Sequence, residues 1–284
     1  MTHPRELLKA HGLFATKRRG QNYLVHPATA RAIAGAAGID PEDTVVEIGA
    51  GLGSLTLALA PLARRVIAVE VDRGIHRALV QVLDRAGVSN VEPLAANALD
   101  LDWAALADQA GGPLAVVGNL PYSVSSPLIF ELLAARHAWR RATLLLQREL
   151  VTRLVAAPGS RDYGRLTVLA DTWCRLKPGM VLGPEQFFPR PRVDSQLVSF
   201  TPRPAGQAVA APGEEAWFSR VVKAAFSQRR KTLANSLAGS LALGRAEVAE
   251  VLRSCGVDPM RRAETLSPDE LAGVARALAD RTPA

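Results

Sequence analysis

Between residues 44 and 147 the chain alternates short apolar runs with segments of helical pattern. Each apolar run has the length and the Val, Ile and Leu content of a buried strand. The five runs are "TVVEIGA", "RRVIAVEVD", "VEPLAAN", "LAVVGNL" and "ATLLLQ". Strands that alternate with helices in this way predict βαβ units, and therefore a mostly parallel sheet covered on both faces.

Two further strands are predicted in "DTWCRLKPG" and "DSQLVSFTP", which are joined through the Pro-rich segment "LGPEQFFPRPRV". Residues 201–216 are rich in Pro, Gly and Ala without periodicity, which indicates a linker. The pattern beyond is helical, with breaks near Gly244, Gly256 and Pro268. We therefore predict an α/β domain, a linker and a small helical domain over residues 1–203, 204–216 and 217–284.

The net charge of +7 and the pI of about 10.0 favour a polyanionic partner, although basic proteins of other kinds are common. No apolar run approaches the roughly 20 residues of a membrane span. The charged N-terminus lacks the apolar core of a signal peptide, so a cytoplasmic protein is expected. Cys174, Cys255 and five scattered histidines predict neither a disulfide framework nor a metal site.

The segment "VVEIGAGLGSLTLALA" predicts a strand, a tight glycine turn and the start of a helix. Gly49 and Gly51 permit positive φ angles and a close approach of the backbone to a ligand. The dinucleotide fingerprint has glycine where Ser54 stands, and the P-loop lysine is missing. Glu70 ends the next strand, where it can accept hydrogen bonds from both hydroxyls of a ribose. This combination indicates a nucleoside cofactor without phosphates, most commonly S-adenosylmethionine, although such turns also merely pack a helix on a strand.

The tetrapeptide Asn119-Leu120-Pro121-Tyr122 stands at the C-terminal end of a predicted strand, where open α/β sheets bind ligands. The side-chain oxygen of Asn119 and the main-chain oxygen of Leu120 can accept hydrogen bonds from both N–H groups of an exocyclic amine, which frees its lone pair for attack. Pro121 fixes the φ angle of the turn. Tyr122 offers a face for stacking, worth about 1–3 kcal/mol per base. These residues predict methylation of adenine, and an ordinary Pro-Tyr turn is the alternative.

With these residues together, the chain closely resembles the ribosomal RNA adenine N6,N6-dimethyltransferase family, and within it the bacterial small-subunit (16S) enzymes. The matching segments fall in family order over nearly the whole chain: "KRRGQNYLV", "VEIGAGLGSLT", "VIAVEVD", "GNLPYSVSSPL", "LLLQRELVTRLVA", "DYGRLTVL", "FFPRPRVDSQLVSF" and "FSQRRKTLANSL". The resemblance implies a class I (Rossmann-like) methyltransferase domain with a mostly parallel seven-stranded sheet, followed by a small all-α domain.

The resemblance also implies an activity. S-adenosylmethionine would be the cofactor, and an immature small ribosomal subunit would be the partner. Four methyl groups would be transferred, two to each of two neighbouring adenines in a hairpin loop near the 3′ end of small-subunit RNA. We expect a monomer that needs no metal.

Site residues follow from the same resemblance. The implied cofactor contacts are Asn22, Leu24, Gly49, Gly51, Glu70, Asn97 and Asn119. The implied catalytic residues are Asn119, Leu120, Pro121, Tyr122 and Phe187, with Phe188 as a substitute for Phe187. Tyr122 and Phe187 would hold the target base between their rings. The family usually has Asp where this chain has Asn97; the Asn oxygen still accepts from the adenine amine, but loss of a charged acceptor predicts weaker binding.

Clustered basic residues predict the surface that binds RNA. They are Lys17, Arg18, Arg19, Arg190, Arg192, Arg220, Lys223, Arg230 and Lys231. One helix is predicted from about 218 to 231. Its apolar face would include Phe218 and Val222, and its opposite face would carry Arg220, Lys223, Arg230 and Lys231. Arg229 falls on the apolar side, which indicates a buried partner or a bend. A solvated amphipathic helix is the alternative for this segment.

Three other functions stay open at this point. A large-subunit adenine methyltransferase would share the core motifs, although "FSQRRKTLANSL" and "FFPRPRVDS" favour the small-subunit group. A nicotinamide oxidoreductase is disfavoured by Ser54 and by the Asn-Leu-Pro-Tyr turn. A catalytically inert factor for ribosome assembly is suggested only by Asn97.

Overall fold

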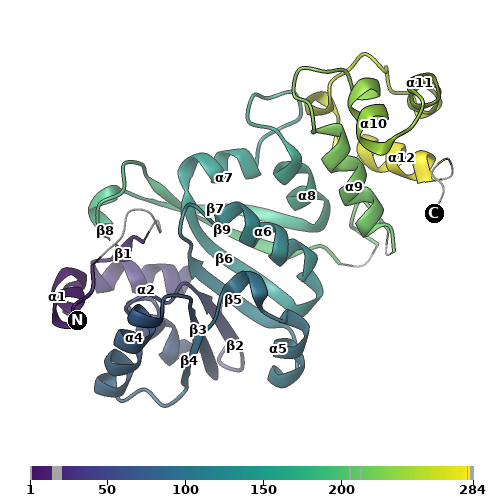
Figure 1. The fold of residues 1–284 in the computed structure, drawn as a ribbon. Helices are drawn as coiled ribbons and strands as arrows, with labels where there is room; N and C mark the ends of the chain where they lie inside the picture. The colour runs from purple at the N-terminus through teal and green to yellow at the C-terminus, as the bar shows by residue number, and fades with distance from the viewer. Residues whose placement is uncertain (1, 15–20, 205, 212, 280, 282–284) are drawn as a thin grey trace. The chain divides into compact units, whose positions relative to one another are not determined.

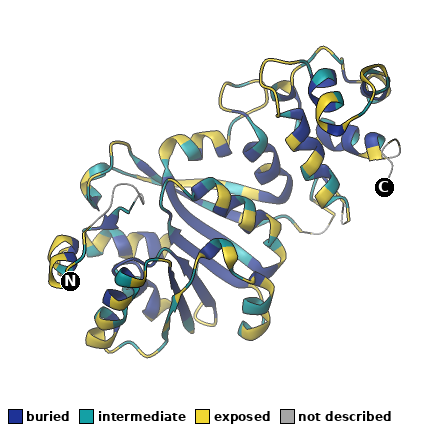
Figure 2. Ribbon diagram, viewed as in Figure 1, coloured by how far each residue is buried: buried dark blue, intermediate teal, exposed yellow. Residues whose placement is uncertain are grey.

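The computed structural model describes residues 2–14, 21–204, 206–211, 213–279 and 281 (Figure 1). Its contacts divide the chain into two compact units. Unit 1 comprises residues 1–151 and 177–202, and unit 2 comprises residues 152–176 and 203–284. Each unit has its own buried side chains (Figure 2).

Unit 1 is built on a seven-stranded sheet with the strand order β4-β3-β2-β5-β6-β9-β7. Neighbouring strands from β4 to β6 are parallel, and β9 runs antiparallel to β6. The strands are β2 (Thr44–Ile48), β3 (Arg65–Glu70), β4 (Val91–Ala95), β5 (Leu114–Asn119), β6 (Trp139–Gln147), β7 (Cys174–Leu182) and β9 (Ser195–Pro202). Every strand predicted from an apolar run is present, so the predicted fold class is confirmed.

Helices connect the parallel strands of unit 1. They are α3 (Thr56–Leu59), α4 (Arg73–Ala86), α5 (Trp103–Ala110) and α6 (Ser125–Ala134), with α1 (Pro4–Ala10) and α2 (Pro27–Ala36) before β2 and α7 (Arg148–Leu154) after β6. Helix α4 begins where Asp72 accepts hydrogen bonds from the N–H groups of Gly74 and Ile75, at 2.8 and 3.2 Å. It ends at Gly87, which has a left-handed φ of 66°.

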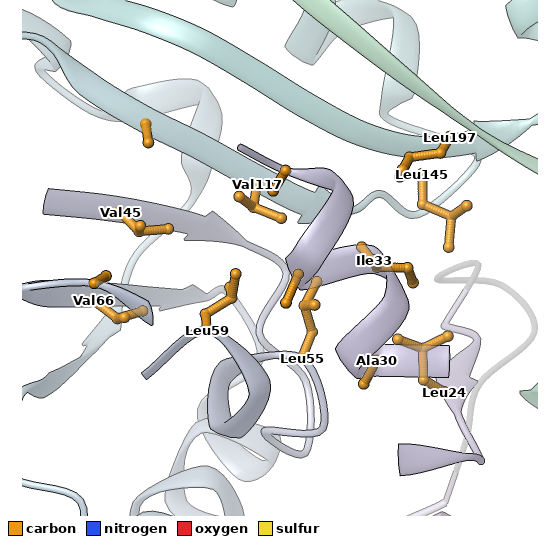
Figure 3. Close-up of a cluster of buried hydrophobic side chains, with 14 of the residues drawn as sticks. Leu24, Ala30, Ile33, Val45, Leu55, Leu59, Val66, Val117, Leu145 and Leu197 are labelled. Atoms are coloured by element: carbon orange, nitrogen blue, oxygen red, sulfur yellow. The ribbon is translucent and has the colours of Figure 1, made fainter. Parts of the chain in front are cut away.

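A large apolar cluster of unit 1 lies between one face of the sheet and helices α2 and α3 (Figure 3). Val45, Val66 and Val117 project from three neighbouring strands onto Ile33 and Leu59, and all five side chains are fully buried. Burial of a side chain of this size contributes about 1.5–3 kcal/mol. The cluster therefore fixes β2, β3 and β5 relative to one another, and with them the loops at their C-terminal ends.

A two-stranded ribbon joins the N-terminal segment to the Pro-rich segment far along the chain. Strand β1 (Tyr23–Leu24) pairs antiparallel with β8 (Phe187–Phe188), with Leu24 opposite Phe187. Leu24 and Phe187 both belong to the large apolar cluster, at 3% and 2% exposure. The ribbon is therefore anchored in the core of unit 1.

Unit 2 is mainly helical. Its helices are α8 (Arg165–Trp173), α9 (Glu215–Ala225), α10 (Leu233–Leu241), α11 (Arg245–Ser254) and α12 (Pro268–Ala279). Trp173 of α8 packs edge-on against Phe218 of α9, with 6.1 Å between ring centroids. Because of such contacts, residues 152–176 group with the C-terminal helices, whereas the predicted boundaries placed them with the methyltransferase domain.

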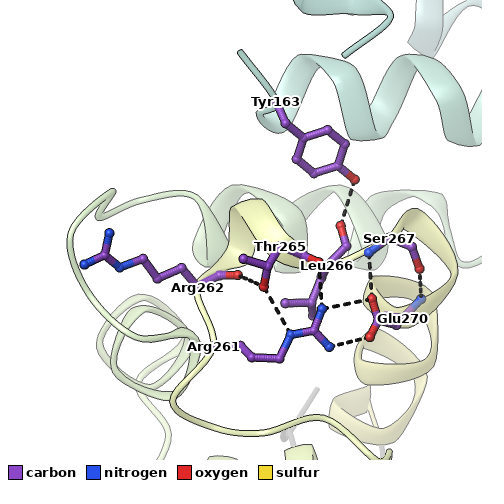
Figure 4. A network of polar contacts seen from close by, with 7 residues as sticks. All are labelled: Tyr163, Arg261, Arg262, Thr265, Leu266, Ser267 and Glu270. Atoms are coloured by element: carbon purple, nitrogen blue, oxygen red, sulfur yellow. Dashed lines mark hydrogen bonds and ion pairs between the residues drawn. The ribbon is translucent and has the colours of Figure 1, made fainter. Parts of the chain in front are cut away.

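A network of hydrogen bonds and ion pairs links segments of unit 2 (Figure 4). Ser267 and Glu270 form a capping box at the start of α12: each side chain accepts a hydrogen bond from the other's backbone N–H, at 3.1 and 2.8 Å. Arg261 donates to the Glu270 carboxylate and lowers its pKa. The Tyr163 hydroxyl donates to the Leu266 carbonyl at 2.9 Å, which ties the segment before α8 to the C-terminal helices.

The single helix predicted from about 218 to 231 is wrong beyond Ala225. Helix α9 ends there, and a turn follows before Thr232 caps α10 through the N–H of Asn235. The predicted apolar face is buried as expected, with Phe218 and Val222 at 1% and 0% exposure. Arg229 needs no buried acid: its guanidinium is exposed and donates to the main-chain carbonyl of Arg161 at 3.0 Å.

Two kinds of feature are absent from the part of the chain that the structure describes. No helix there combines the length and the apolar character needed to cross a bilayer. No three side chains of His, Cys, Asp or Glu gather there as a potential metal-ligand set.

Candidate active site

A cavity of about 760 Å³ opens at the C-terminal ends of β2, β3, β4 and β5. It lies where the strand order reverses, between β2 and β5, which is the usual ligand position in open α/β sheets. Its volume falls within the roughly 300–1,000 Å³ typical of small-molecule sites. All the predicted cofactor contacts line it: Asn22, Leu24, Gly49, Gly51, Glu70, Asn97 and Asn119.

The glycine turn after β2 has backbone angles that disfavour any residue with a side chain. Gly49 and Gly51 have φ angles of 74° and 55°, where a residue with a β-carbon is strained. A β-carbon on Gly51 would lie 3.1 Å from Cδ1 of Tyr23, and one on Gly49 would lie 3.5 Å from the main-chain oxygen of Asn119. The backbone of the turn itself therefore forms this wall of the cavity.

Glu70 is held by backbone N–H groups on both of its oxygens. Gly51 donates to Oε2 at 3.0 Å, and Asp72 donates to Oε1 at 2.9 Å. The residue is only 7% exposed. Each carboxylate oxygen has a further lone pair, so the two contacts hold the carboxylate in place as an acceptor for a ligand in the cavity.

Asn119, the last residue of β5, has an oriented side chain. Its Nδ2 donates to the main-chain carbonyl of Asn22 at 2.8 Å. Because only the nitrogen of the amide can donate, this contact distinguishes Nδ2 from Oδ1. It leaves Oδ1 available to accept a hydrogen bond from another group. Sequence reasoning identified Asn22 as a cofactor contact and missed this role of its main-chain oxygen, which only the tertiary fold reveals.

Leu120 and Pro121 also line the cavity, and Leu120 is anchored on both sides. Its N–H donates to the Leu145 carbonyl of the neighbouring strand at 3.2 Å, and its side chain is 1% exposed. Pro121 begins a turn that is closed by the Ser125 hydroxyl, which donates to the Pro121 carbonyl at 3.0 Å. The backbone after Asn119 is thus held in a defined path.

The aromatic residues predicted to hold a base lie outside the set that lines the cavity. Tyr122 is half-buried, its hydroxyl is 2.9 Å from Ser195 Oγ, and burial raises its pKa. Phe187 is 2% exposed within the large apolar cluster, so in this structure its ring belongs to the core. Phe188, the predicted substitute, is half-buried and packs edge-on against His3, with 5.6 Å between ring centroids.

The predicted RNA-binding residues that the structure describes are all at least partly exposed. Arg190 and Arg192 lie between β8 and β9 in unit 1. Arg220 and Lys223 lie on α9 in unit 2, and Arg230 and Lys231 lie in the turn before α10. Lys17, Arg18 and Arg19 fall outside the described residues.

Glu47, in the middle of β2, is a site residue that sequence reasoning missed. It lines the cavity and is 1% exposed. Burial raises the pKa of its carboxyl to about 8; the nearby Thr56 hydroxyl opposes this shift, and the charge of Glu70 adds to it. At neutral pH this carboxyl is therefore largely protonated. A charged residue inside an otherwise apolar strand was the only sequence signal.

Glu47→Gln is expected to raise stability increasingly with pH. The carboxyl keeps its proton up to about pH 8 when folded but only to about 4.5 when unfolded, so the wild type loses stability as pH rises between these values. The neutral amide avoids this loss. Thermal unfolding at pH 5, 6, 7 and 8 should show a growing advantage of several degrees for the variant. Exposed Glu42→Gln is the matched control, and an advantage that does not change with pH would contradict the assignment.

A family model described as ribosomal RNA adenine dimethylase matches residues 14–280. The chain is 44% identical to the ribosomal RNA small subunit methyltransferase A of Myxococcus xanthus (strain DK1622), with 100% of this chain and 98% of the relative covered. It is 42% identical to the protein of the same name from Moorella thermoacetica (strain ATCC 39073 / JCM 9320), with 96% and 95% covered.

Two solved structures share the fold over most of the chain. A dimethyladenosine transferase from Plasmodium falciparum superposes with a TM-score of 0.75 at 24% identity, covering 91% of this chain and 98% of that one. The 23S rRNA methyltransferase ErmE superposes with a TM-score of 0.65 at 25% identity, covering 91% and 100%.

Proposed function

Because the chain belongs to the ribosomal RNA adenine dimethylase family, we propose that it transfers methyl groups from S-adenosylmethionine to the N6 amines of two adjacent adenosines in small-subunit RNA. The target would be the hairpin loop near the 3′ end, and each adenosine would receive two methyl groups. One observation carries the proposal: the oriented Asn119 amide, the glycine turn and Glu70 line one cavity.

The cavity residues fit this cofactor. The turn at Gly49 and Gly51 permits the backbone to approach a ligand closely. The carboxylate of Glu70 is oriented to accept hydrogen bonds from the two ribose hydroxyls. When bound, S-adenosylmethionine supplies an electrophilic methyl group on its positively charged sulfur. Asn22 and Leu24 would contact it from β1 and the residue before it.

Asn119 and Leu120 would prepare the adenine amine for attack. The lone pair of this amine is delocalised into the ring, which makes it a poor nucleophile. Asn119 Oδ1 and the Leu120 carbonyl would accept hydrogen bonds from its two N–H groups, and Pro121 holds the turn that presents these oxygens. No general base is needed, because the methylated amine loses its extra proton readily to water. Catalysis would therefore consist mainly of positioning.

Aromatic stacking would hold the flipped base. The Tyr122 ring is fixed by the contact of its hydroxyl with Ser195 and would cover one face. Stacking of about 1–3 kcal/mol per base offsets much of the few kcal/mol needed to unstack the nucleotide. Phe187 would serve as the second face only after leaving the apolar cluster, whereas the Phe188 ring already reaches the surface.

The choice of the small subunit rests on eight relatives that are 40–44% identical over 95–100% of this chain and are named as small-subunit methyltransferases. The large-subunit enzyme ErmE shares only 25%. Because ribosomes are assembled in the cytoplasm, we place the enzyme there. We also propose that the protein acts as a monomer.

Incubation with undermethylated small subunits and methyl-labelled cofactor tests the function. Label should enter small-subunit RNA, and mapping should find two neighbouring dimethyladenosines. Large subunits and fully methylated small subunits serve as controls. Label in large-subunit RNA alone would favour a large-subunit adenine methyltransferase, and cofactor binding without any incorporation would favour an assembly factor.

The exposed basic turn before α10 would contact RNA phosphates. Arg230→Glu combined with Lys231→Glu should weaken RNA binding and reduce the salt dependence. Each lost phosphate contact lowers the slope of log K against log salt by about 0.7–0.9. Binding titrations at several salt concentrations would measure this. Arg245→Glu with Arg253→Glu, on exposed positions of α11, makes the same charge change elsewhere in unit 2. If the slope of log K against log salt were equal for both double variants, the turn would have no special role in binding RNA phosphates.

A further inference from the structure

Asn97, just after β4, lines the cavity with a side-chain amide that is engaged at both ends. Its Oδ1 accepts a hydrogen bond from the N–H of Leu99 at 3.2 Å. Its Nδ2 donates to Oδ2 of Asp100 at 2.9 Å. A backbone N–H can only donate and a carboxylate can only accept, so both contacts require the same orientation of the amide.

The strand order determines which part of a cofactor would meet this amide. Along β5-β2-β3-β4 the polar groups follow in the order Asn119, glycine turn, Glu70 and Asn97. With the methyl group near Asn119 and the ribose at Glu70, the adenine ring lies towards Asn97. The adenine amine needs an acceptor there, and Oδ1 has a second lone pair to offer. If the Asn97 amide were reversed, its nitrogen would face the adenine amine, and two hydrogen-bond donors would oppose each other.

We propose that Asp100 is a positioning residue for cofactor recognition. It holds the Asn97 amide so that its oxygen, and not its nitrogen, faces the amine of the cofactor's adenine. This inference rests on the proposed function and deepens it, since it names a group outside the lining of the cavity that determines which base the cavity accepts.

Calorimetric titration with two ligands tests this role without any turnover. S-adenosylhomocysteine carries the amine, and its inosine analogue carries an oxo group at the same position. The wild type should bind the amine-bearing ligand on the order of tenfold more tightly, because the oxo group of the analogue and Asn97 Oδ1 are both acceptors. In Asp100→Ala only the N–H of Leu99 still orients the amide, so the nitrogen can turn to the oxo group for the loss of that one contact, and the preference should fall. Asp100→Asn should keep it, because its amide oxygen still accepts from Asn97.

A double variant gives the complementary result. When Asn97→Asp is combined with Asp100→Ala, the new carboxylate at position 97 offers an acceptor in either orientation, so the preference for the amine should return. Asp108→Ala is the control, since it removes an exposed aspartate of α5 with the same change in charge.

Two outcomes would overturn the role of Asp100: an unchanged preference in Asp100→Ala, or an equal loss of affinity for both ligands. A wild type that binds neither ligand would instead refute the proposed cofactor.

Discussion

Asn119→Ala is expected to lower kcat/KM for methyl transfer by about 100- to 1,000-fold, the range seen when one preorganised hydrogen-bonding group is removed from an active site. The side chain supplies an acceptor for the amine, and its orientation is fixed by the Asn22 carbonyl at 2.8 Å. Binding of RNA and of cofactor should change far less, because both rest mostly on other residues. Rates with undermethylated subunits and separate binding titrations measure the two effects.

Asn119→Asp tests whether the orientation of the side chain matters in addition to the presence of an acceptor oxygen. The aspartate keeps an oxygen in place of Oδ1 but sets a second oxygen against the Asn22 carbonyl, so its side chain should turn and activity should fall by at least about tenfold. Wild-type turnover by the alanine variant would refute the catalytic role of Asn119. Wild-type turnover by the aspartate variant alone would refute the importance of the contact with Asn22.

Glu70→Ala is expected to weaken binding of S-adenosylmethionine by at least about 100-fold. A hydrogen bond to a charged group contributes about 1.5–3 kcal/mol, tenfold in affinity corresponds to about 1.4 kcal/mol, and two ribose hydroxyls would lose their acceptor. The N–H groups of Gly51 and Asp72 also lose theirs, which loosens the glycine turn. Equilibrium dialysis with labelled cofactor measures the affinity.

Glu70→Gln keeps the size of the side chain and controls for loss of folding. Its amide nitrogen must face either the N–H of Gly51 or that of Asp72, so one donor opposes another. We expect a folded protein, shown by its unfolding temperature, that also binds cofactor weakly. Near wild-type affinity in this variant would show that the carboxylate is not the ribose acceptor.

The sheet could be read from the sequence because each strand carries its own signal. Buried parallel strands such as β2 and β5 need continuous apolar runs, and Gly49 and Gly51 after β2 mark a turn with left-handed φ angles. Asn119 and Glu70 were identified for the same reason, since each polar residue directly follows an apolar run. These features are local, and local sequence determines them.

The helix boundary at Ala225 was not visible in the same way. The helical pattern continues past it, but the N–H groups that begin α10 find acceptors far along the chain, with Leu233 donating to the Arg261 carbonyl at 2.7 Å. Tertiary hydrogen bonds thus hold the start of α10. Arg230 and Lys231 were consequently placed on a helix face when they lie in a turn.

What the sequence alone determined was which residue types stand at the ends of the strands, and hence the class of chemistry. The tertiary structure decided how they are oriented: the Asn22 carbonyl that aligns Asn119, the burial that keeps a proton on Glu47, and the core position of Phe187. Each of these depends on groups from different strands and loops meeting in space. Hydrogen-bond direction and desolvation act over a few ångströms, so they are determined only once the chain has folded.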